Sequence, residues 1–171
     1  MVKIKFPDGA IRSYESGLTP YEIASSISSG LARSIISSDF NGQKIETTTQ
    51  IFDDGNLTFY TWKDNEGKEA FWHSTAHLLA QVLEEFYDGI KLTIGPAISN
   101  GFYYDIDFGK HSMSEKDFLK IEKRMIEIAR EKHEFKLRSI SKKEALDFYK
   151  KNKNQYKILL IENLTDGEIT F

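Results

Sequence analysis

The chain has 171 residues, of which 40% are hydrophobic and 29% charged, and its formal net charge is −3. This composition is typical of a globular protein with one large domain or two small ones. Cysteine is absent, which excludes disulfides and thiolate metal ligands and fits a reducing compartment. No apolar run approaches a membrane span, and the N-terminus lacks a signal-peptide core. We therefore expect a cytoplasmic protein.

Positive charge is concentrated between Lys116 and Lys143, where ten Lys or Arg residues accompany five Asp or Glu residues. Such an excess indicates either a solvated helical face or a strip that faces phosphate groups. Because the whole chain is weakly acidic, its net charge gives no argument for nucleic-acid binding.

The first 30 residues combine a strand pattern with a helix start. Alternating apolar residues at 2–6, a Pro-Asp-Gly turn and residues 11–14 predict a β-hairpin. Thr19 followed three residues later by Glu22 is a capping box, with proline at the first helical position. Gly30 is the expected end of this helix.

Residues 34–45 predict a second hairpin around an Asn-Gly turn, and residues 57–61 predict a further strand. This order favours a small sheet that packs on one helix. The polar stretch 63–69 is then the best candidate for a boundary between two domains, residues 1–62 and 63–171.

The second half begins with an amphipathic helix over residues 71–86. Its buried stripe has the helical spacing of Leu79, Val82, Leu83 and Phe86. At about 100° per residue, His73 and His77 lie roughly 40° apart and well over 90° from this stripe. The two imidazoles therefore share a face that suits a pocket wall, a metal site or a wet surface.

The remaining chain alternates strands and helices. We expect, in order, a strand at 91–98 broken by Gly95-Pro96, a strand at 102–107, a helix at 114–132, a strand at 135–140, a helix at 141–151, a strand at 156–161 and a strand at 169–171.

A histidine pair alone is a weak metal signal. A zinc site needs a third protein ligand, so we expect no bound metal. The metalloprotease motif also requires Glu directly after the first His, where this chain has Ser74. Solvent-exposed histidines without a function remain an alternative, and we expect His111 and His133 to be solvated.

Lys157 is unusual because it interrupts an apolar run. It is either an edge-strand lysine that reaches solvent or a cation that points into a cleft. The aromatic run Tyr103-Tyr104-Asp105 is equally open between core packing and a pocket wall. The helical phase predicts that the histidines face a pocket bounded by the Asn100-Gly101 turn and the Lys157 strand, with one side open.

Several motifs together resemble the N-terminal region of bacterial-type threonyl-tRNA synthetases over the whole chain. Residues 1–62 resemble the TGS domain, a ubiquitin-like β-grasp module. The motifs that resemble the editing domain of this family are Trp72-His73-Ser74-Thr75-Ala76-His77-Leu78-Leu79, Ile94-Gly95-Pro96, Asn100-Gly101-Phe102-Tyr103-Tyr104-Asp105, Glu122-Lys123-Arg124-Met125 and Tyr156-Lys157. The implied fold class is α+β, a β-grasp domain followed by an editing domain with an antiparallel sheet on helices.

The resemblance implies hydrolysis of seryl-tRNA by a second site, because serine differs from threonine by one methyl group. It places His73, His77 and Lys157 in the catalytic set and Tyr104 and Gly95 in the substrate pocket. It leaves the division of roles among them open. The editing site of this family is completed by a Cys-x-x-x-His element, which this sequence lacks, so we expect an incomplete domain.

The resemblance also implies partners and cofactors. It implies tRNA as partner through the acceptor end, ATP and zinc in a catalytic core that lies outside this sequence, and a homodimer through that core. We expect a monomer for residues 1–171 alone. The rival hypotheses are a stand-alone RNA-binding or regulatory module and a zinc-dependent aminoacyl-tRNA hydrolase that uses the histidine pair.

Overall fold

The computed structural model describes residues 1–133, 135, 138–165 and 169–170. The chain forms two compact units, Met1–Trp72 and His73–Phe171. The first unit ends inside a helix, and the predicted domain boundary after residue 62 stays a prediction. No helix among the described residues combines the length and apolar character that a membrane crossing requires.

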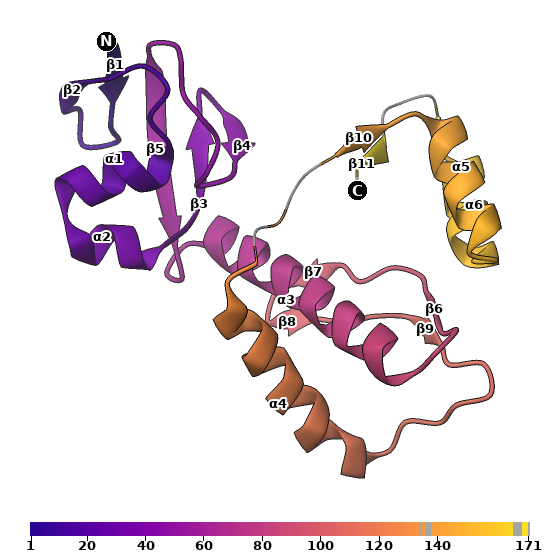
Figure 1. Cartoon of the computed structure of the whole chain (residues 1–171). Helices are drawn as coiled ribbons and strands as arrows, with labels where there is room; N and C mark the ends of the chain where they lie inside the picture. The colour runs from indigo at the N-terminus through magenta and orange to yellow at the C-terminus, as the bar shows by residue number, and fades with distance from the viewer. Residues whose placement is uncertain (134, 136–137, 166–168, 171) are drawn as a thin grey trace. The chain divides into compact units, whose positions relative to one another are not determined.

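The first unit is a mixed five-stranded sheet with two helices (Figure 1). Its elements are β1 (Val2–Lys5), β2 (Ile11–Tyr14), α1 (Pro20–Ile27), α2 (Ser29–Ser34), β3 (Ile35–Phe40), β4 (Gln43–Ile45) and β5 (Gly55–Thr61). The strand order is β2-β1-β5-β3-β4, with β1 and β5 parallel and every other pair antiparallel. Both predicted hairpins are present, and the β-grasp prediction is confirmed.

The core of this unit lies between the sheet and α1. Val2 and Ile4 alternate with exposed lysines in β1 and pack with Ile23 of α1 and Leu57 of β5, all at most 4% exposed. Burial of each such side chain contributes about 1.5–3 kcal/mol. The alternating pattern of the N-terminal strand therefore directs its apolar face onto α1.

The first helix starts as predicted but ends earlier. The Thr19 hydroxyl accepts the Glu22 N–H, and the Glu22 carboxylate accepts the Thr19 N–H at 2.8 Å. Gly30 does not end the helix, because it lies inside α2. The Ser28 hydroxyl accepts the Leu31 N–H at 3.0 Å and thereby starts a second short helix.

The polar stretch after β5 is helical from Asn65 onwards, as the start of α3 (Asn65–Phe86). Asp64 precedes it and holds its first turn, since its carbonyl accepts the Lys68 N–H at 3.0 Å and its carboxylate accepts the Thr61 N–H at 2.7 Å. A Cβ on Gly67 would lie 2.0 Å from the Thr61 carbonyl oxygen. Glycine thus lets this helix start pack directly on the end of β5.

The second unit holds the rest of α3 together with short strands and three further helices (Figure 1). The elements are β6 (Lys91–Leu92), β7 (Ala97–Ile98), β8 (Gly101–Phe102), β9 (Ile106–Asp107), α4 (Glu115–Glu131), β10 (Ser139–Ile140), α5 (Lys142–Lys151), α6 (Gln155–Glu162) and β11 (Ile169–Thr170). The pairs β6–β9, β7–β8 and β10–β11 are antiparallel. The predicted break at Gly95-Pro96 and the α+β class are confirmed.

The core of the second unit joins α3 and α4. Val82 and Leu83 of α3, both at most 1% exposed, pack with Ile121 and Ile128 of α4. Leu79 and Phe86 are partly buried against the same cluster. The predicted apolar stripe of the histidine helix is therefore the core face, and His73 and His77 are left on another face.

Three predicted strands differ in the structure. The predicted strand 102–107 is a strand only at its ends, where Phe102 belongs to β8 and residues 106–107 form β9. Residues 156–161 are helical, as part of α6, because Asn154 caps a helix start there. Of the predicted strand 135–140, only Ser139–Ile140 is a strand, and residues 136–137 lie outside the described residues. The last residue of the predicted strand 169–171, Phe171, also lies outside them.

Candidate functional site

His73 and His77 are in direct contact on α3. Their Nε2 atoms lie 3.1 Å apart, and their ring centroids are 4.6 Å apart at an interplanar angle of 84°. A hydrogen bond at this distance requires one Nε2 to carry a proton and the other to accept it. The pair therefore shares a proton between the two rings and can take up one more.

The environment of His77 favours its neutral form. Burial lowers its pKa first, and the neighbouring His73 and the charge of Lys157 lower it further. The ring of Phe135 lies 6.3 Å from the His77 ring, between centroids. The side chain of His77 remains solvent-accessible. A neutral imidazole that water can reach is suited to general-base catalysis near neutral pH.

Lys157 belongs to α6, and its charge acts on His77. Its side chain is half-buried, and burial lowers its pKa. No ion pair with Lys157 is found among the described residues. The structure thus brings Lys157 within electrostatic reach of His77, although on a helix and not on the predicted strand.

Tyr104 and Gly95 are in close contact. A Cβ on Gly95 would lie 2.4 Å from Cδ2 and 2.5 Å from Cε2 of Tyr104, so the ring packs directly on the glycine backbone. The predicted break at Gly95-Pro96 therefore has a packing role. Burial raises the pKa of Tyr104, and the charge of Glu84 adds to this effect.

Glu84 and Tyr149 are two residues near Tyr104 that sequence reasoning missed. Burial raises the pKa of Glu84, and its charge acts on both tyrosines. Glu84 lies seven residues after His77 on α3, which is about 20° away around the helix axis. Its position around the helix axis could have indicated that Glu84 lies on the histidine face. Nothing in the sequence linked Tyr149 of α5 to Glu84.

A cavity of about 530 Å³ lies on the apolar side of α3. It is lined by Thr75, Leu79, Leu83, Phe102, Tyr103, Tyr104, Ile106, Phe108, Met113, Phe118, Ile121, Glu122 and Met125. Neither histidine lines it, and neither does Lys157. The pocket predicted around the histidines is a different one and stays a prediction, whereas Tyr104 borders this apolar cavity.

The other histidines bond elsewhere. His111 Nε2 lies 2.9 Å from the Asp88 carbonyl oxygen, and His133 Nε2 lies 2.8 Å from Glu131. The part of the chain that the structure describes contains no cluster of three His, Cys, Asp or Glu side chains able to hold a metal ion.

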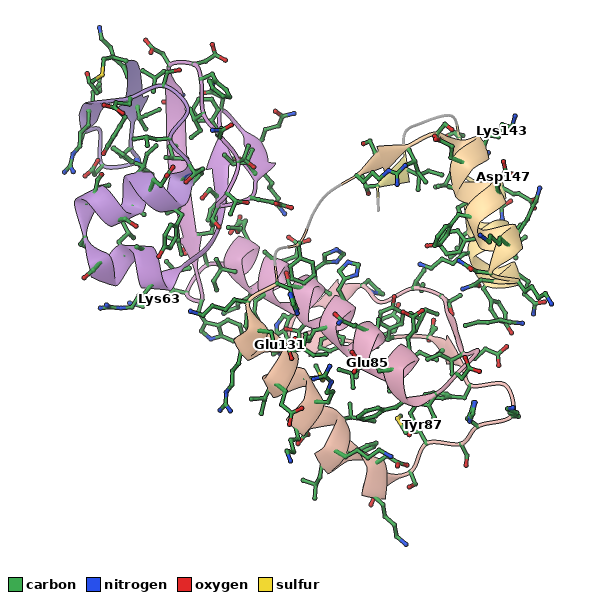
Figure 2. All side chains as sticks on the ribbon, in the orientation of Figure 1. Lys63, Glu85, Tyr87, Glu131, Lys143 and Asp147 are labelled. Atoms are coloured by element: carbon green, nitrogen blue, oxygen red, sulfur yellow. The ribbon has the colours of Figure 1, made fainter. Side chains whose placement is uncertain are left out.

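Much of the basic charge of α4 is paired within the second unit. Arg124 donates to both carboxylate oxygens of Glu85, at 2.7 and 3.2 Å, and lies 3.4 Å from Glu131. Figure 2 labels Glu85 on α3 and Glu131 on α4. Lys120 pairs with Asp117 at 3.3 Å. These contacts favour a solvated, ion-paired helical face over a strip that faces phosphates.

The chain is similar to known proteins along its whole length. Residues 2–61 match the family described as the TGS domain. The whole chain is 58% identical to the threonine–tRNA ligase of Flavobacterium psychrophilum and 60% identical to that of Flavobacterium johnsoniae, over 171 residues in each case. It is 48% identical to the threonine–tRNA ligase of Cytophaga hutchinsonii. In each comparison it spans 26% of the relative's length.

The predicted resemblance is thus confirmed over the full length of the sequence. The chain carries a TGS domain, and all of it matches the N-terminal part of threonine–tRNA ligases.

Proposed function

We propose that the chain acts within a threonine–tRNA ligase and that its second unit holds the site that removes serine from mischarged tRNA. The full-length match to such ligases supports the first part. The protein would use ATP and tRNA in the cytoplasm, with the zinc site and the homodimer contacts in segments that this sequence does not include. These segments correspond to the part of the relatives that the chain does not span.

The chemical need for such a site follows from the substrates. One methyl group separates threonine from serine and is worth only about 1–3 kcal/mol in a binding pocket. A second site that hydrolyses the smaller product provides the missing discrimination. Tyr104 packs on Gly95 and borders the apolar cavity, and in this proposal it also forms one wall of the histidine site.

The His73–His77 contact is the observation that carries the proposal, and the lowering of the His77 pKa by the charge of Lys157 supports it. Water attacks the ester carbonyl carbon, and the imidazole pair accepts the proton that the water loses. Lys157, as an ammonium, stabilises the oxyanion that forms on the carbonyl oxygen. When the ester bond breaks, the proton passes from the pair to the leaving ribose oxygen.

The proton balance of the pair fits this role. The two rings share one proton at 3.1 Å, so the pair starts with one free acceptor. Once it has taken the water proton, the positive charge of Lys157 opposes keeping it and favours its return to the leaving group. The same cation thus serves the oxyanion and the final proton transfer.

Hydrolysis of seryl-tRNA tests the proposal. The chain should replace the matching part of the Flavobacterium johnsoniae ligase, so that the test uses a protein of full length. Separate replacement of His73, His77 and Lys157 by alanine should slow hydrolysis by about 10²-fold or more. His133→Ala is the matched control, since His133 bonds only to Glu131 among the described residues, and it should leave the rate unchanged. Equal rates in all four variants would contradict the proposal.

A further inference from the structure

Asn154 uses both ends of its side-chain amide. It is 9% exposed and lies directly before α6. Its Oδ1 accepts the Lys157 N–H at 3.1 Å, which caps the helix. Its Nδ2 donates to the Leu92 carbonyl oxygen at 3.0 Å, which ties this helix end to β6.

A second hydrogen bond is made by Tyr156, two residues after Asn154. The Tyr156 hydroxyl donates to Oδ2 of Asp107 at 2.9 Å. Asp107 is held in turn, because its Oδ1 accepts the Gly109 N–H at 2.8 Å. The bond from Gly109 lowers the pKa of Asp107 most, and the bond from Tyr156 lowers it further. The carboxylate therefore stays ionised and accepts both bonds.

Both ties end on the same pair of strands. Leu92 is in β6 and Asp107 is in β9, and the two strands pair through Lys91–Asp107 and Leu92–Ile106. The start of α6 is therefore bonded at two points to one two-stranded ladder. Lys157 is the residue next to Tyr156, and its own backbone N–H is one of the bonded groups.

We propose that Asn154 and the Tyr156–Asp107 pair are positioning residues, which hold Lys157 beside the His73–His77 pair. This inference rests on the proposed function of Lys157 and adds the groups that place it. These hydrogen bonds matter for Lys157 because its ammonium has no ion-pair partner among the described residues that would hold it in place. Without them, Lys157 would turn toward water, where an ammonium is better solvated.

The position of Lys157 can be tested without an activity assay, because its charge lowers the pKa of His77. This pKa is measured by NMR titration of residues 1–171. Among the described residues, the charged or titratable groups that act on His77 are His73 from α3 and Lys157 from α6. Removing the cation in Lys157→Met should therefore raise this pKa. Tyr156→Phe loses the bond to Asp107 and should raise the pKa of His77 by part of that shift. Asn154→Ser keeps a capping hydroxyl but loses the bond to Leu92, and it should also raise this pKa by part of the shift.

A double variant separates positioning from a general loss of structure. In the Lys157→Met background, Tyr156→Phe should cause no further change in the pKa of His77. Ser141→Ala removes a comparable cap from the neighbouring helix α5, where the Ser141 hydroxyl accepts the Glu144 N–H at 3.3 Å. This control should leave the pKa of His77 unchanged.

The outcomes are distinct. An unchanged His77 pKa in Tyr156→Phe and Asn154→Ser, or a Tyr156→Phe shift that persists without Lys157, would overturn the inference. An unchanged pKa in Lys157→Met would overturn it as well. If the titrations behave as expected but seryl-tRNA hydrolysis ignores Lys157, the positioning stands and the proposed function fails.

Discussion

Replacing Gly95 by alanine tests how tightly the wall of the candidate site is built. The new Cβ would lie 2.4 Å from Cδ2 and 2.5 Å from Cε2 of Tyr104, whereas ordinary contact begins at 3.4 Å. The Tyr104 ring must therefore retreat by about 1 Å, since protein interiors have little free space to absorb the overlap.

The expected size of the effect follows from this overlap. Overpacking of this kind costs about 1–3 kcal/mol. For a unit of this size, a loss of 1 kcal/mol lowers Tm by about 4–8 °C. A displacement of about 1 Å at a catalytic site can also slow the reaction by about 10²-fold. We expect Gly95→Ala to lower both Tm and the rate of seryl-tRNA hydrolysis.

The measurements are thermal unfolding by circular dichroism and hydrolysis in the full-length chimera. Gly30→Ala is the matched control, because Gly30 is helical and its nearest neighbour would be the Ser28 hydroxyl at 3.9 Å. It should stabilise the protein by about 0.5–1 kcal/mol. In a Tyr104→Ala background the cost of Gly95→Ala should nearly vanish. An unchanged Tm in Gly95→Ala with Tyr104 intact would refute the reasoning.

Three further predictions concern other parts of the chain. Residues 1–62 should fold alone, because their core closes within the first unit; a collapsed amide spectrum would contradict this. Purified protein should contain no stoichiometric zinc, since two histidines leave the ion under-coordinated; elemental analysis that finds one zinc per chain, lost in His77→Ala, would overturn the prediction. The pKa of His77 is lowered in the folded state, so the unfolded state binds more protons, and stability should fall as the pH drops below the ordinary value of 6.5. His77→Gln should weaken that pH dependence in urea titrations, and an unchanged dependence would contradict the assignment.

Local signals in the sequence predicted much of the first unit. The capping box at Thr19 and Glu22 satisfies its own backbone groups, and at the turn the Gly42 N–H is accepted by the Asp39 carboxylate. Asn41 and Gly42 adopt φ values of 55° and 85°, which the predicted tight turn requires. Such features depend on neighbours in the sequence, and no distant contact is needed to predict them.

The misassigned segment 156–161 shows where local pattern fails. A short apolar run has no period that separates a buried strand from a helix. Asn154, three residues before Lys157, was the cap signal that decides the matter, since its Oδ1 accepts the Lys157 N–H. The sequence therefore contained the information, but in a polar residue outside the apolar run.

The candidate site was predictable only in part. The shared face of His73 and His77 follows from helical phase, and the structure confirms that their rings meet at 3.1 Å. The approach of Lys157 depends on ties to Leu92 and Asp107, which are 62 and 49 residues away from the groups they bond. Contacts of that range leave no periodic trace in one sequence, and the resemblance indicated only that Lys157 belongs with the two histidines.

The most direct test of the central proposal compares two substrates in one preparation. Single-turnover hydrolysis of seryl-tRNA and threonyl-tRNA should be followed with the full-length chimera, and in parallel with residues 1–171 alone. We expect the chimera to hydrolyse seryl-tRNA much faster than threonyl-tRNA, and residues 1–171 alone to be weak or inactive. Hydrolysis of both esters at the same rate, or rapid seryl-tRNA hydrolysis that survives loss of His73 and Lys157, would contradict the account.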